Sequence, residues 1–110
     1  MKYARLVATH DDEPSETLVV VGQFNYDDWL VPKQEAFGYV KDLEMDGNLY
    51  RYPFILEPDT GKTATLNWGG FDDTLTLVDL LNRRLAKGEK IVRTEGGERY
   101  SYTIISMHLY

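Results

Sequence analysis

Alternation of hydrophobic and polar residues predicts β-strands over most of the chain. Gly96-Gly97 separates the last two alternating segments, as is typical of a tight hairpin turn. The expected strands cover residues 2–9, 17–24, 37–45, 48–56, 63–70, 89–95 and 98–105. The pattern therefore predicts about seven strands in a mostly antiparallel sheet.

Two turns predict how the central strands pair. Asp46-Gly47 is a strong two-residue hairpin signal, and it places Leu43 opposite Tyr50. A three-residue loop at residues 59–61 places Leu56 opposite Ala64, with Gly61 in the left-handed region. Both registers put the apolar residues on one face, which we expect to form the core. This face comprises Phe37, Tyr39, Leu43, Tyr50, Tyr52, Phe54, Leu56, Leu66 and Trp68.

Gly61-Lys62-Thr63 matches the last three letters of a phosphate-binding loop. The full motif needs a glycine five positions earlier, where this chain has Leu56, and it needs a helix afterwards. The residues that follow alternate as a strand does. We therefore interpret this stretch as a hairpin turn and expect no bound nucleotide.

A leucine stripe predicts one helix, at residues 72–88, formed by Leu77, Leu80, Leu81 and Leu85. Asp72-Asp73, or Thr76 with Asp79, would begin the helix and Gly88 would end it. Five strands, one helix and two strands give an α+β fold with the helix packed on one face of the sheet. We expect a single domain over residues 1–110.

Composition narrows the function classes. The net charge of −6 disfavours nucleic acid, which binds basic surfaces. The chain has no cysteine, and no apolar run is long enough for a signal peptide or a membrane span. We therefore expect a cytoplasmic protein that contacts neither nucleic acid nor membrane.

Catalytic and cofactor motifs are missing from the sequence. His10 and His108 lie far apart in the chain, and no metal-binding spacing surrounds them. No serine elbow or cysteine nucleophile is present. Three carboxylate doublets, at residues 11–12, 27–28 and 72–73, leave an acid–base pair open. We expect no catalytic residues, no metal and no cofactor.

The long connection at residues 25–35 is the candidate binding segment, because long loops in compact domains are often functional. Aromatic residues beside polar ones are typical of binding hot spots. The alternative is that Trp29 folds back and plugs the end of the sheet. The residues predicted to contact a partner are Tyr26, Asp27, Asp28, Trp29 and Leu30.

These observations favour a small non-enzymatic protein that acts by contacting another protein, as a regulator, adaptor, inhibitor or immunity-type protein. The partner is unknown, and a homodimer is compatible with the sequence. The first alternative is a small-ligand binder with a pocket between the helix and the tyrosine-rich sheet. The second is a hydrolase-type enzyme that uses a carboxylate pair.

Overall fold

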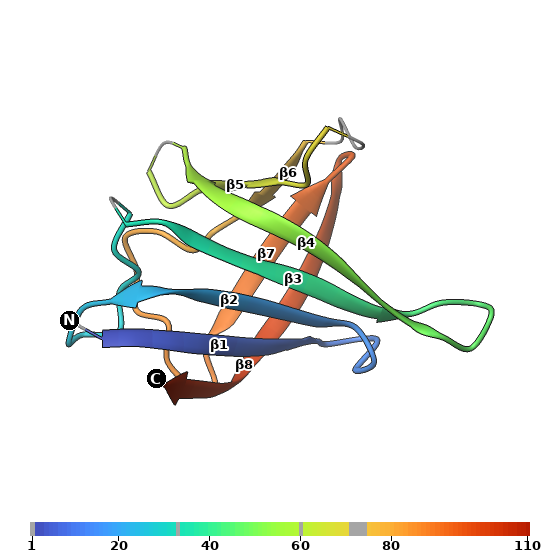
Figure 1. Ribbon diagram of the computed structural model, residues 1–110, viewed down its shortest axis with the longest axis horizontal. Coiled ribbons are helices and arrows are strands. Elements are labelled where there is room, and N and C mark those ends of the chain that lie inside the picture. The colour runs from blue at the N-terminus through green and yellow to red at the C-terminus, as the bar shows by residue number, and fades with distance from the viewer. Residues whose placement is uncertain (1, 33, 60, 71–74) are drawn as a thin grey trace.

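The computed structural model describes residues 2–32, 34–59, 61–70 and 75–110. These residues form a closed antiparallel barrel in which each strand pairs with its neighbours in the chain and β8 pairs back with β1 (Figure 1). The strands are β1 Lys2–His10, β2 Thr17–Phe24, β3 Ala36–Leu43, β4 Leu49–Pro58, β5 Ala64–Asn67, β6 Thr76–Val78, β7 Lys90–Glu95 and β8 Glu98–Leu109. The hairpin predicted at Gly96-Gly97 is confirmed, since Glu95 pairs with Glu98.

The α+β prediction is wrong. The described residues contain eight strands and no helix, and hence none of a length and hydrophobicity that could span a membrane. Residues 76–78 of the predicted helix form β6, which closes the barrel between β5 and β7. Asp72-Asp73, predicted to begin the helix, lies outside the described residues.

Three of the four leucines of the predicted helix instead cover one end of the barrel, whereas Leu77 lies in β6. Leu80, Leu81 and Leu85 are buried, but they project from an irregular loop at residues 79–89. Asn82 has a φ of 55°, which a right-handed helix cannot accommodate. The Asp79 carboxylate accepts a hydrogen bond from the backbone of Val92 at 2.7 Å, so it anchors the loop to β7 rather than capping a helix.

The predicted register between β3 and β4 is wrong by one residue. Leu43 pairs with Leu49 rather than with Tyr50. The reason is that the amide of Glu44 donates to the carbonyl of Asn48, which leaves a three-residue turn, 45–47, in place of the predicted two-residue turn. A one-residue shift moves a side chain to the other face of the sheet. Phe37 therefore lies on the outside of the barrel, while Gly38 and Val40 face the interior.

The register between β4 and β5 differs from the prediction by two residues. Pro58 pairs with Ala64, and the amide of Asp59 donates to the carbonyl of Thr63, so the turn covers residues 60–62 rather than 59–61. Thr60 is not described. The predicted positive φ of Gly61 is confirmed at 61°. Leu56 now pairs with Leu66, and both remain buried.

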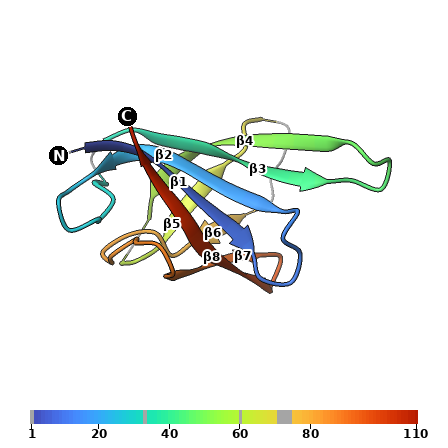
Figure 2. The same cartoon turned by 90° about the horizontal axis from the view of Figure 1, so that it is seen from below.

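The two ends of the barrel differ. One end is covered by the loops at residues 25–35 and 79–89, which are joined by a 2.8 Å hydrogen bond from the amide of Leu85 to the carbonyl of Asp28. We call this the capped end. The other end, the mouth, has the turns that follow β1, β3, β5 and β7. The β3–β4 hairpin projects beyond the mouth along the 41 Å long axis of the molecule (Figures 1 and 2).

Gly38 is required by the close approach of β2 and β3. A Cβ atom there would lie 1.8 Å from the carbonyl oxygen of Val19, which is backbone and cannot move aside. We expect Gly38→Ala to lower the free energy of unfolding by about 2–3 kcal/mol. Gly70→Ala is the control, because nothing lies within 4 Å of its Cβ position, and it should change stability by less than about 0.5 kcal/mol. Equal denaturation midpoints for the two variants would contradict this packing.

Candidate functional site

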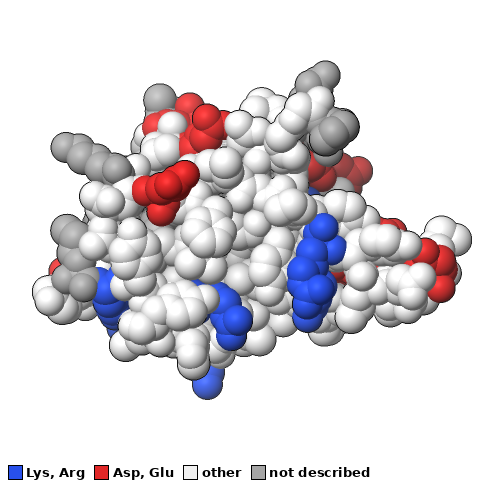
Figure 3. All heavy atoms as spheres, viewed as in Figure 1, with Lys and Arg blue, Asp and Glu red and all other residues white. Residues whose placement is uncertain are grey.

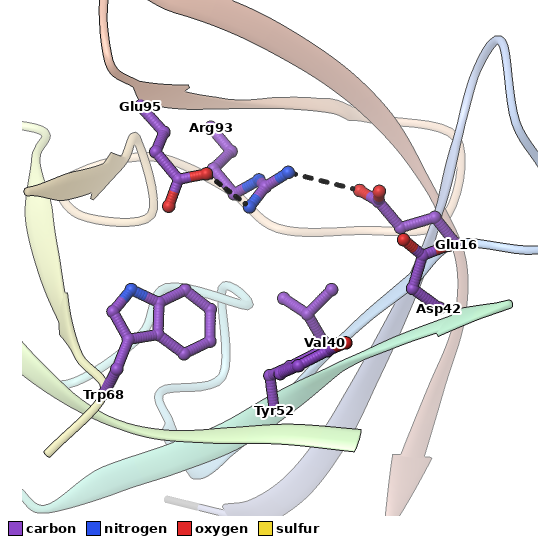
Figure 4. A pocket seen from close by; sticks show the side chains of 7 residues that line it. All are labelled: Glu16, Val40, Asp42, Tyr52, Trp68, Arg93 and Glu95. Carbon is purple, nitrogen blue, oxygen red and sulfur yellow. Dashed lines mark hydrogen bonds and ion pairs between the residues drawn. The ribbon is translucent and has the colours of Figure 1, made fainter. Parts of the chain in front are cut away.

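A cavity of about 270 Å³ opens at the mouth of the barrel (Figure 4). Its lining is mostly polar, in contrast to the apolar interior beneath it. Side chains from β3, β4 and β7, from the turn before β2 and from the residue after β5 line it. They are Glu16, Val40, Asp42, Tyr52, Trp68, Arg93 and Glu95.

Strand alternation places these side chains inside the barrel. In β7, Ile91 faces the apolar interior, and Arg93 and Glu95 follow it on the same face toward the mouth. In β3, Val40 and Asp42 follow the same order. The inward positions of the strands thus change from apolar to polar toward the mouth.

Arg93 is the central cation of the site. Its side chain is about 10% exposed and lies between two carboxylates, with Nη2 3.4 Å from Glu16 and Nη1 3.4 Å from Glu95. The guanidinium also lies over the ring of Tyr100, 4.6 Å from its centroid. This contact adds a cation–π interaction to the two ion pairs of the buried guanidinium.

Hydrogen bonds extend from Arg93 to both sides of the barrel. On one side, the Trp68 indole donates to Thr76 at 3.0 Å, and Thr76 donates to Glu95 at 2.6 Å. On the other side, the buried Tyr102 hydroxyl donates to Glu16. Burial and then this hydrogen bond raise the pKa of Tyr102 above its ordinary value, so Tyr102 remains a proton donor at neutral pH.

The hydrogen-bonding capacity of Arg93 is incompletely used. Its Nε is buried and has no hydrogen-bond partner among the described residues. Both ion pairs, at 3.4 Å, are longer than the ~2.7–2.9 Å of a strong charge-assisted hydrogen bond. The unpaired Nε is a donor and offers nothing to a cation, but the long ion pairs leave Glu16 and Glu95 able to accept further hydrogen bonds.

Three carboxylates cluster at the rim of the cavity. One oxygen from each of Glu13, Glu16 and Asp42 lies within 4.8 Å of the others. Oxygen ligands of this kind suit Ca²⁺ or Mg²⁺. Glu16, however, already accepts hydrogen bonds from Tyr102 and Arg93, so a metal would compete with a fixed guanidinium. A metal ion at this cluster would therefore have to share Glu16 with Arg93 and Tyr102.

The two histidines lie in unrelated places. His10 ends β1, and its Nδ1 accepts hydrogen bonds from the amides of Asp12 and Glu13 at 3.1 and 3.0 Å. This contact stabilises the acidic turn after β1. His108 lies near the end of β8 beside Tyr110. The structure does not bring the two imidazoles together at one site.

The residues predicted to bind a partner lie at the capped end, opposite the mouth. The Asn25 side chain folds them into a tight turn, accepting hydrogen bonds from the amides of Asp27 at 2.9 Å and Trp29 at 3.0 Å. Tyr26 at the tip is 83% exposed and Trp29 is 40% exposed. The turn presents both aromatic residues to solvent.

The remaining two residues of the predicted site have structural contacts. Leu30 is 3% exposed and packs in the core, so Leu30 rather than Trp29 fills the end of the barrel. Asp28 pairs with Lys2 at 2.5 Å and adopts a φ of 65°. The prediction of a partner site therefore depends on Tyr26, Asp27 and Trp29.

Sequence reasoning missed the residues of the mouth. Arg93 and Glu95 lie in phase with the buried Ile91, so the alternation itself places two charged residues on the inner face. Buried charges are rare unless they are paired or functional. That signal was available in the sequence, but the partners Glu16 and Trp68 come from distant parts of the chain.

Arg93→Met tests the interior ion pairs. It leaves two carboxylates at the mouth without their cation, and we expect it to lower the free energy of unfolding by about 3 kcal/mol. Adding Glu16→Gln should recover about 1 kcal/mol or more, because the two residues interact directly. Arg99→Met, at an exposed position of β8, is the control and should cost less than about 0.5 kcal/mol. Purely additive effects in chemical denaturation would contradict the coupling.

Comparisons with known proteins found no relative from which a function for the site could be inferred. The chain matches no protein-family model, and neither the curated proteins nor the solved structures gave a match. The function proposed for the mouth therefore rests on its residues, their distances and their charges.

Proposed function

We propose that the protein binds a small organic cation, an alkylamine or an alkylguanidinium, in the mouth of the barrel. The observation behind the proposal is an excess of carboxylates in a cavity with aromatic walls. Glu16, Asp42 and Glu95 oppose the single guanidinium of Arg93, which leaves two negative charges in the lining. Such a lining attracts cations and repels anions.

The aromatic side chains add to this preference. Trp68 and Tyr52 lie across the cavity from Arg93 and Glu95 (Figure 4). A cation held against an aromatic face gains about 0.5–2 kcal/mol, depending on how far it is desolvated. The cavity volume of about 270 Å³ suits a compact ligand rather than a large one.

Binding agrees with the geometry better than catalysis does. Glu16 and Asp42 form the close carboxylate pair that a hydrolase would need. Glu16, however, accepts hydrogen bonds from Tyr102 and Arg93, contacts that hold it as a fixed carboxylate. The pocket expected between a helix and the sheet is replaced here by a pocket inside the barrel.

Calorimetric titration with butylamine and butylguanidinium tests the proposal. We expect saturable binding with a Kd of about 1 mM, the range for very small ligands, and none for butyrate or butanol. Asp42→Asn should weaken binding about threefold to tenfold, because it removes one carboxylate from the cavity. Asp27→Asn makes the same charge change at the capped end and should leave the affinity unchanged. Equal binding of butyrate and butylamine would refute a cation site.

A second candidate function is protein contact at the capped end, which we propose because Tyr26 and Trp29 are exposed there on a turn held by Asn25. Rigid exposed aromatic side chains are common anchors in protein interfaces. Asp27 would then lie at the rim, where charges mainly tune the association rate.

Trp29→Ala distinguishes an anchor from a core residue. Since Trp29 is 40% exposed, we expect a loss of about 1 kcal/mol or less, whereas Leu30→Ala should cost about 2–4 kcal/mol. In a Trp68→Phe background, the emission of Trp29 should be quenched by acrylamide. Protected, blue-shifted emission would show that Trp29 is buried and would contradict the anchor.

A further inference from the structure

The edge of β4 near the mouth is open. β4 pairs with β3 from Leu49 to Leu56, but β5 pairs only with Ile55–Pro58 on the other side. Residues 49–54 thus have no strand partner on the β5 side within the described part of the chain. The barrel wall has a gap there, and the ring contact between Phe54 and Trp68 marks its inner limit.

This gap is continuous with the cavity at the mouth. Tyr52 from the open edge and Trp68 from the end of β5 line the same cavity, one on each side of the gap. A second hollow, lined by Pro53, Ile55 and Asn67 among others, follows the outer side of the same gap. A chain lying along β4 would therefore pass directly over the site proposed for a cation.

The surroundings of the edge are largely apolar and acidic, and its one basic side chain, Arg51, lies over the ring of Tyr39. Leu49 and Met45 are exposed on the projecting hairpin, and Met45 is fully exposed at its tip. Glu44 and Asp46 lie beside them and accept hydrogen bonds from the hydroxyls of Tyr52 and Tyr50. Acidic side chains gather at this projecting end of the molecule (Figure 3). The complementary partner is a basic segment with apolar side chains.

We infer that the cation bound in the mouth is the lysine or arginine side chain of an extended polypeptide that adds as a strand to the open edge of β4. This inference rests on the proposed cation site. In strand addition, main-chain hydrogen bonds supply affinity, and pockets that receive alternate side chains supply specificity. Pro53 has no amide hydrogen to donate, so an added strand would form its main-chain hydrogen bonds with the other residues of this edge.

A blocked heptapeptide of alternating valine and threonine with a central lysine is the probe. We expect it to bind the full chain about tenfold or more tightly than butylamine, because it gains main-chain hydrogen bonds. Replacing its lysine with norleucine should abolish binding. N-methylation of alternate peptide amides should lower its affinity to that of butylamine. Hydrogen exchange should slow at the amides of residues 49–52 when the peptide binds.

The outcomes separate the two proposals. If butylamine binds but the peptide gains nothing and N-methylation has no effect, strand addition is wrong and the cation site stands. If neither butylamine nor the peptide binds, the cation site itself is wrong. If sedimentation shows a dimer with protected amides at residues 49–52 before peptide is added, a second copy of the chain occupies the edge and the inference is overturned.

Discussion

Closure of the sheet by β6 is the constraint on which the rest of the structure depends. This strand has only three residues, Thr76–Val78, yet it joins β5 to β7 and completes the ring of strands. Its pairing also builds the mouth, since Thr76 lies opposite Glu95 and Val78 lies opposite Arg93. Without β6, the guanidinium and its carboxylates would lie on an open sheet in water, where ion pairs contribute little.

The strands could be predicted where hydrophobic and polar residues alternate strongly. The wrongly predicted helix could not be excluded, because the local pattern there fits both a helix and a strand. Leu77, Leu80, Leu81 and Leu85 match helical spacing, while Thr76 and Val78 match strand spacing over the same residues. Packing decides between the two, because β5 and β7 need a partner and the open end of the barrel needs apolar cover. That need arises from residues distant in sequence, so no local window contains it.

The register error has a similar cause. Counting a two-residue loop at Asp46-Gly47 aligned the aromatic residues of β3 and β4 on one face, which resembled a core. The actual face contains Gly38 and Val40, small enough for the close approach of β2 and for the ring of Phe54. The candidate site was also out of reach of local pattern. Alternation places Arg93 and Glu95 on the inner face, but only closure of the barrel brings Glu16 and Trp68 to them.

The short strands β5 and β6 close the barrel but also leave part of β4 unpaired. They complete the barrel near its middle, yet they are too short to cover β4 from Leu49 to Phe54. An exposed strand edge is a liability that proteins usually shorten, charge or interrupt. Here the edge keeps six residues, is interrupted at Pro53, and borders the polar cavity, in whose lining three carboxylates oppose one guanidinium. A sheet that only needed to be stable would gain by extending β5 across this gap, which would also close the side of the cavity. Entry of a ligand between β4 and β5, as proposed above, would account both for this opening and for the excess of carboxylates behind it.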